Sequence, residues 1–192
     1  LFRSPLDTHE QQAVIRALED QLLQQNRTFR LGCGGVALVV GLFFVYAAYQ
    51  QQLHPWEAKY TGELRPVTGQ ATAAAVLLLQ GLGMLTAHMA LMTELPKRGE
   101  RERACMPAGM RVQMLLYAAA AFSFMGLVYW SSALWAMVQR YGYDMGSKWE
   151  LVWLPLLPFG LCVLCYYVVQ SLQATAADMQ RLKRLQYDYK KV

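Results

Sequence analysis

Four long runs of residues without a charged side chain alternate with short polar segments along this chain. The runs cover residues 31–56, 66–93, 112–139 and 151–177. Because each run holds at least 26 residues at about 1.5 Å per helical residue, each exceeds the roughly 30 Å of bilayer hydrocarbon. The pattern predicts four transmembrane helices. Their apolar centres lie at about 31–50, 70–92, 112–137 and 151–172.

The chain ahead of the first run has a helical pattern of its own. Thr8 and Gln11 match a capping box, in which both side chains satisfy free amides of the first helical turn. Apolar residues then recur at helical spacing and form a predicted docking face of Val14, Ile15, Leu18 and Leu22. Acidic and basic residues balance up to Arg30, where we expect this helix to end, so anionic lipid attracts it little. We therefore expect residues 1–30 to form an amphipathic helix that docks on protein rather than on lipid.

The residues after the fourth predicted span, 173–192, are expected to continue as a basic helical tail. The expected fold class is an all-α integral membrane protein, with four transmembrane helices bundled within residues 31–172. An even number of crossings returns the chain to its starting side. The N-terminal amphipathic helix and the C-terminal tail should therefore lie on the same side of the membrane.

Composition supports a membrane protein, and the positions of the basic residues explain the net positive charge. Hydrophobic residues make up 55% of the chain and charged residues 16%, against about 25% charged in average soluble domains. A net charge of +5 is compatible with binding nucleic acid. However, the basic residues lie beside the apolar runs, where they orient a membrane protein. We therefore expect no nucleic-acid partner.

Lysine and arginine are distributed unequally between successive polar segments. The N-terminal segment, the second loop and the tail together hold 14 of them, and the first and third loops hold 4. The positive-inside rule then predicts that both termini are cytoplasmic. Tryptophan favours the headgroup region. All five tryptophans fall at the ends of the runs that are predicted to face away from the cytoplasm. These are Trp56, Trp130, Trp135, Trp149 and Trp153.

Small residues recur every four positions in the first span, at Cys33, Ala37 and Gly41. This spacing lets two helix backbones approach closely. We interpret the three residues as a helix-packing seam, either with another span or with a partner subunit. The alternative is ordinary use of small residues in membrane helices.

Gln80 and His88 supply most of the polar content of the second span. An amide or imidazole in hydrocarbon needs a partner, so both should face protein or water. Gln80, with the backbone near Gly81 and Gly83, is expected to make a contact between helices. For His88 we favour a hydrogen bond that fixes helix packing over a role in proton relay or ligand binding.

The fourth span contains Cys162 and Cys165 in a C-x-x-C spacing. Hydrocarbon disfavours thiolates, and no second pair of ligands is present for zinc, so we interpret both as small buried residues. Pro155 and Pro158 precede them and are expected to bend the helix or to mark an irregular outer end.

The sequence predicts no catalytic residues, no cofactor site and no metal site. Its three histidines, His9, His54 and His88, fall in different compartments of the predicted topology, and no carboxylates are paired near a membrane face. A membrane-embedded enzyme acting on lipid is therefore disfavoured.

We expect a non-enzymatic accessory or structural subunit of a larger membrane complex, which contacts membrane lipids and binds other membrane protein subunits through its spans and cytoplasmic helices. The alternative is a lipid or small-solute conduit, such as a scramblase-like or carrier protein, because prolines interrupt the fourth span and the second has a polar face. The endoplasmic reticulum membrane is the favoured location, with the mitochondrial inner membrane as the alternative.

Overall fold

The computed structural model describes residues 8–93, 109–142 and 151–189, and the side chains within 12–93, 109–142 and 151–182. This part of the chain is helical and contains no strand. Its helices are α1 (Thr8–Leu53), α2 (Lys59–Gly62), α3 (Gln70–Thr93), α5 (Met110–Tyr141) and α6 (Trp153–Tyr189). All except α2 are long and apolar enough to cross a membrane. The predicted all-α membrane fold with four spans is confirmed for the described residues.

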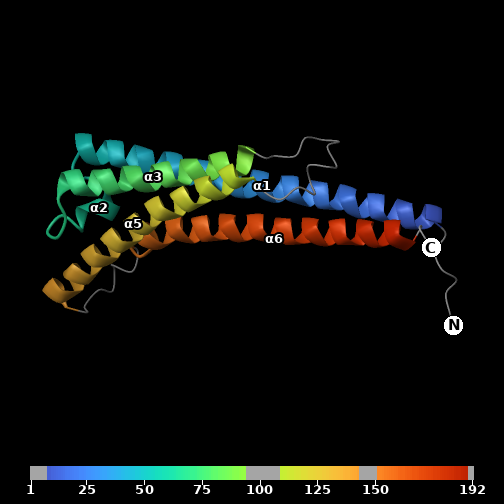
Figure 1. The fold of residues 1–192 in the computed structure, drawn as a ribbon. Helices are drawn as coiled ribbons and strands as arrows, with labels where there is room; N and C mark the ends of the chain where they lie inside the picture. Colours follow the sequence, from blue (N-terminus) through green and yellow to red (C-terminus); the bar gives the residue numbers. More distant parts are fainter. Residues whose placement is uncertain (1–7, 94–108, 143–150, 190–192) are drawn as a thin grey trace.

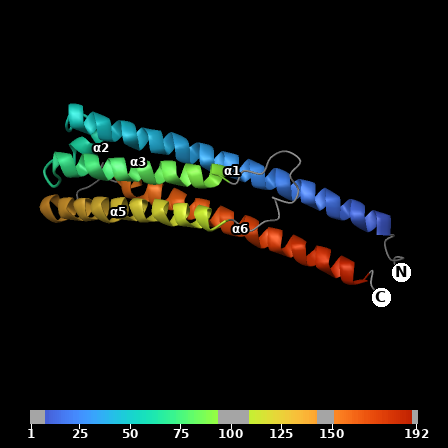
Figure 2. The ribbon, with the colours of Figure 1, turned by 45° about the horizontal axis from the view of Figure 1, so that its top comes forward.

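The four long helices run alternately up and down and form one bundle (Figure 1). α3 holds the central place because it packs against α1, α5 and α6, while α6 also contacts α1 and α5 (Figure 2). At one end of the bundle, α1 and α5 finish and α3 and α6 begin, and we call this the loop end. At the opposite end α3 finishes and α5 begins, and we call this the stalk end.

Two helices continue beyond the stalk end as an antiparallel pair (Figures 1 and 2). With 46 residues α1 extends about 69 Å, against about 36 Å for the 24 residues of α3. We call the pair the stalk, formed by residues 8–30 of α1 and 173–189 of α6. The stalk places the two described chain ends at the same end of the molecule.

The N-terminal helix does not end near Arg30 as predicted, because α1 continues through this residue into the first span. Arg30 is buried, and its Nε donates a hydrogen bond of 2.8 Å to Oδ1 of Asn26, one turn earlier. The charged side chain is thus held along the helix instead of interrupting it. Gly34 and Ala37 follow on a buried face, so tertiary packing offsets the weak helix propensity of glycine.

Buried side chains form three layers along the bundle and a small contact in the stalk. The loop-end layer holds large residues, including Phe44, Leu77, Trp130 and Leu154. The middle layer holds Ala37, Met84, Ala87, Ala119 and Cys162, and the stalk-end layer holds Ala90, Leu91, Val112, Leu116, Cys165 and Val169. The stalk contact joins Leu22 to Met179. Three of the five residues in the middle layer are alanines, and such small side chains allow helix backbones to approach closely.

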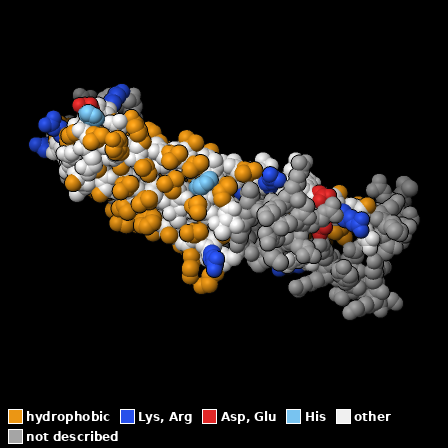
Figure 3. All heavy atoms as spheres, turned by 90° about the horizontal axis from the view of Figure 1, so that it is seen from above, with side chains coloured by type: hydrophobic (Ala, Val, Ile, Leu, Met, Phe, Trp, Pro, Cys, Tyr) orange, Lys and Arg blue, Asp and Glu red, His pale blue; other side chains and the backbone are white. Residues whose placement is uncertain are grey.

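The outer surface of the bundle is apolar. Figure 3 shows hydrophobic side chains spread over the visible face of the bundle, with charged side chains gathered towards its ends. Large apolar residues on several helices stay exposed, among them Val39, Met125 and Val163. An apolar surface of this breadth is unfavourable in water but suits hydrocarbon.

One tryptophan does not lie where the sequence placed it. Trp130 has no exposed surface and belongs to the core, so its assignment to the headgroup region is wrong. Trp135 is exposed as a headgroup residue should be, whereas Trp149 lies outside the described residues. Trp153 packs at the loop end with its ring 5.9 Å from Phe43 and 6.1 Å from Tyr60.

The first loop contains the short helix α2, between Pro55 and Pro66. Tyr60 of α2 packs between Phe43 and Trp153. Burial, and secondly the neighbouring Tyr46, raise the pKa of Tyr60. The Tyr60 hydroxyl therefore stays neutral at physiological pH.

Candidate functional site

Gln80 of α3 is a polar side chain in the core of the described bundle that bonds to two other helices. It is completely buried, and its Oε1 accepts a hydrogen bond of 2.9 Å from Nε1 of Trp130 in α5. Its Nε2 donates a hydrogen bond of 3.2 Å to the backbone carbonyl of Leu154 in α6. One amide thus joins three helices, and both of its ends are satisfied inside the apolar core.

Pro158 explains why the carbonyl of Leu154 needs a donor. Within α6 this oxygen would accept from the N–H four residues later, but proline has none. Gln80 supplies the missing donor from another helix. Pro155 lies in the first turn of α6, where an N–H has no partner within the helix, so it costs no hydrogen bond.

The predicted seam of Cys33, Ala37 and Gly41 faces the interior of this chain. Ala37 is buried in the middle layer, and Cys33 is half-buried against the stalk-end layer. A Cβ atom at Gly41 would lie 3.2 Å from the backbone nitrogen of Leu85 in α3. Glycine at this position therefore lets the α1 and α3 backbones touch.

Gly81 and Gly83 place α3 between its two neighbours. A Cβ atom at Gly81 would lie 3.0 Å from the backbone nitrogen of Val45 in α1. A Cβ atom at Gly83 would lie 3.2 Å from the carbonyl oxygen of Ala119 in α5. The two glycines thus allow close backbone contact on opposite sides of one helix.

His88 forms a second polar contact between helices near the stalk end. Its Nδ1 lies 2.9 Å from the carbonyl oxygen of Gly34 in α1. Because a carbonyl only accepts, Nδ1 must carry the proton in this contact. A third contact joins α5 to α6, where Oγ of Ser123 lies 3.2 Å from Sγ of Cys162.

The predicted docking face of the N-terminal helix is divided in the structure. Leu22 is buried against Met179 of α6, so this chain itself covers that end of the face. Ile15 is half-buried. Val14 and Leu18 are 52% and 41% exposed, and they lie one turn apart on the stalk. Only these two apolar residues of the predicted face are free for another protein.

The described residues contain no group of three potential metal ligands among His, Cys, Asp and Glu. His54 lies at the exposed loop end, 3.7 Å from Glu57, and is far along the chain from His88 in the bundle. The side chain of His9 and all of Cys105 lie outside the described part. Within the spans, the side chains of His88, Ser123 and Cys162 make polar contacts between helices.

Sequence reasoning missed two members of the Gln80 network, Trp130 and the carbonyl of Leu154. A proline within an apolar run leaves the carbonyl four residues earlier without a donor, so Pro158 already pointed to Leu154. Nothing comparable pointed to Trp130, because an indole ring suits both the headgroup region and a buried site with an acceptor. No protein-family model, curated protein or solved structure matches this chain.

Proposed function

We propose that this chain is a non-enzymatic subunit of a larger membrane complex and that its stalk docks a partner protein. The observation that carries the proposal is the exposure of Val14 and Leu18 on a helix that projects beyond the bundle. An apolar pair one helical turn apart can insert between the side chains of a partner helix. Since α1 runs unbroken from the stalk into the bundle, docking there would hold the whole protein in a fixed orientation.

The polar residues of the spans support a structural role. Both ends of the Gln80 amide and Nδ1 of His88 are engaged with other helices of the same chain. Groups used in this way stabilise one arrangement of the helices. They are poorly placed to hold a substrate at the same time.

Orientation and compartment belong to the same proposal. The excess of Lys and Arg in the segments at the stalk end favours a cytoplasmic stalk. The partner is then a cytoplasmic domain, or a helix next to the membrane, with an exposed apolar surface. The endoplasmic reticulum remains the favoured membrane, and the mitochondrial inner membrane the alternative.

The proposal is tested by purifying the tagged protein from its native membrane in a mild detergent. A stoichiometric partner should co-purify with the wild type and be lost with Val14→Ser/Leu18→Ser. The matched control is Ala13→Ser/Ala17→Ser, which alters two exposed residues on a neighbouring face of the same helix. A stable monomer without any partner, or equal recovery with both double variants, would contradict docking through this face.

A lipid or solute conduit has less support as a second candidate. The bundle centre is filled, since Leu77, Met84 and Trp130 have no exposed surface. The carbonyl freed by Pro158 is occupied by Gln80, so the proline opens no polar path in the described structure. Reconstituted liposomes test this alternative, which requires transport that His88→Ala or Gln80→Leu changes.

A further inference from the structure

α1 and α6 leave a gap in their packing within the bundle near the stalk end. The gap is an apolar hollow of about 320 Å³. Its walls include Phe29, Gly32, Cys33 and Val36 from α1, with Leu164 and Cys165 from α6. Gly32 leaves this wall open, because a Cβ atom there would meet no atom within 4 Å. We call this space the chain hollow.

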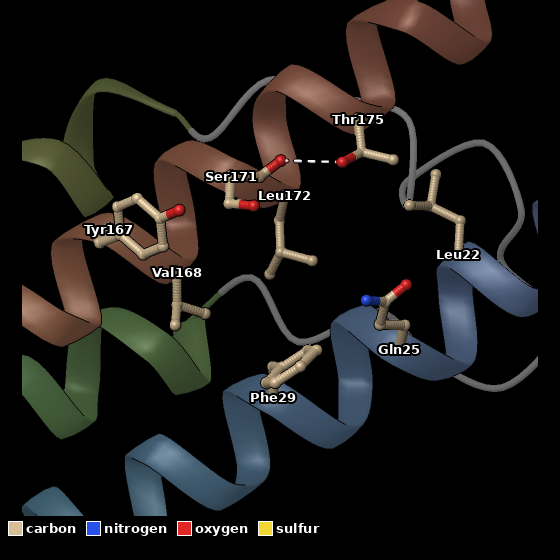
Figure 4. A pocket seen from close by; sticks show the side chains of 8 residues that line it. All are labelled: Leu22, Gln25, Phe29, Tyr167, Val168, Ser171, Leu172 and Thr175. Atoms are coloured by element: carbon tan, nitrogen blue, oxygen red, sulfur yellow. Dashed lines mark hydrogen bonds between the residues drawn. The ribbon is translucent and has the colours of Figure 1, made fainter.

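A second hollow, of about 170 Å³, follows along the same two helices towards the stalk (Figure 4). Phe29 lines both hollows, so the two are consecutive. The second hollow has the more polar lining, with Gln25 of α1 and Tyr167, Ser171 and Thr175 of α6, whereas Thr28 is the one hydroxyl residue that lines the first. We call this space the head hollow.

The two hollows lie at different depths in the membrane. Cys33 and Cys165 line the chain hollow and also pack with Leu91 and Val112, which lie close to where α3 ends and α5 begins. The chain hollow is therefore inside the leaflet on the stalk side. The head hollow lies where the bundle meets the stalk, since Gln25 and Thr175 already belong to the stalk. The uncharged runs end close by, at Arg30 and Asp178, so this is the level where hydrocarbon gives way to headgroups.

Hydrogen-bond donors are available in the head hollow. Thr175 Oγ1 donates a 3.0 Å bond to the carbonyl of Ser171 in its own helix. The side-chain amide of Gln25 and the hydroxyl of Ser171 make no hydrogen bond to another described residue. Figure 4 shows Gln25 on α1 facing the α6 residues across the hollow. Both groups can donate to a phosphate or ester oxygen.

We propose that these consecutive hollows form a binding site for one phospholipid of the stalk-side leaflet. An acyl chain occupies the chain hollow, and the phosphate and glycerol esters face Gln25 and Ser171. The order of the hollows matches the order of apolar and polar parts in a phospholipid at that depth. A volume of about 320 Å³ falls at the lower end of the range of roughly 300–1,000 Å³ for small-molecule sites.

A transmembrane helix of a partner fits this groove less well. Such a helix would be apolar along the full depth of the bundle, whereas the chain hollow is confined to the stalk end. It would also place apolar side chains against the hydrogen-bond donors of the head hollow. These donors would then lose their bound water without gaining a hydrogen-bond acceptor.

Gly32→Leu tests the site, because the new side chain enters the open chain hollow without meeting existing atoms. The matched control is Gly35→Leu, since Gly35 also faces open space but does not line the hollow. The full chain is reconstituted in liposomes with a phospholipid carrying a diazirine halfway along one acyl chain. We expect cross-links in the wild type and in Gly35→Leu to concentrate on residues 29–36 and 161–165. In Gly32→Leu their yield should fall about tenfold.

The head hollow is tested by a second pair of variants. Gln25→Ala with Ser171→Ala should lower the fraction of protein that retains one phospholipid in native mass spectrometry, and Gln24→Ala with Ser171→Ala should lower it less. Equal cross-linking in Gly32→Leu and Gly35→Leu would overturn the proposal, as would labels spread evenly over all lipid-facing helices. A protein cross-linked at residues 29–36 in native membranes would overturn it in favour of a partner helix.

Discussion

The side-chain amide of Gln80 donates to the backbone carbonyl of Leu154, the oxygen that Pro158 leaves without a donor in its own helix. The same side chain accepts from Nε1 of Trp130. Three helices that are distant in the sequence are thereby joined at one buried amide. This network fixes how α3, α5 and α6 lie relative to one another at the loop end.

Gln80→Leu should destabilise the bundle by about 1–3 kcal/mol, because it leaves the Trp130 N–H and the Leu154 carbonyl buried without a partner. The free energy of unfolding in a denaturing-detergent titration measures the loss. Gln139→Leu serves as the control, since it changes an exposed amide near the end of α5 and should have little effect. Equal stability of the two variants would show that the network does not stabilise the fold.

Pro158→Ala should reduce the cost of Gln80→Leu. Alanine restores an N–H that can donate to Leu154 within α6, so the carbonyl no longer depends on Gln80. A double-mutant cycle should give a coupling free energy of about 0.5–3 kcal/mol between the two positions. Additive effects of the two substitutions would contradict the assigned role of the proline.

Gly81→Ala should destabilise the protein by about 1–3 kcal/mol, because the added Cβ atom meets backbone atoms of α1. Gly35→Ala adds the same atom to the same kind of helix but into open space. The control should be neutral or slightly stabilising, since alanine has the higher helix propensity. Thermal unfolding of both variants in one detergent compares them directly.

His88→Leu should cost about 0.6–2 kcal/mol of stability, because Nδ1 no longer donates to the carbonyl of Gly34. His88→Gln, which keeps a donor, should recover part of the loss. The free energy of unfolding is measured for both variants. Identical losses of stability in His88→Leu and His88→Gln would mean that the imidazole acts through its bulk alone.

Much of the fold followed from the sequence because it depends on local composition. Four uncharged runs longer than the bilayer permit few arrangements other than four spans. The small residues of α1 and the polar residues of α3 also indicated contacts between helices. The sequence could not say which helix receives each contact, because the choice depends on the rotation and offset of helices in three dimensions.

The predictions that were wrong also concern interactions that depend on the three-dimensional arrangement of the helices. Continuity of α1 across Arg30 depends on a hydrogen bond to Asn26 and on packing, both of which override weak local propensity. Trp130 is buried because Gln80, 50 residues away, supplies an acceptor for its N–H. The apolar face of the N-terminal helix is divided because α6 continues far enough to cover Leu22.

The most direct test of the account is the accessibility of position 14 in native membranes. A Val14→Cys variant, with Cys105→Ser to remove a native thiol, is treated with a membrane-impermeant maleimide before and after purification away from partners. We predict protection in the membrane and full labelling after purification, while Ala17→Cys in the same background is labelled in both states. Equal labelling of position 14 in both states would contradict a stalk that docks a partner through Val14 and Leu18.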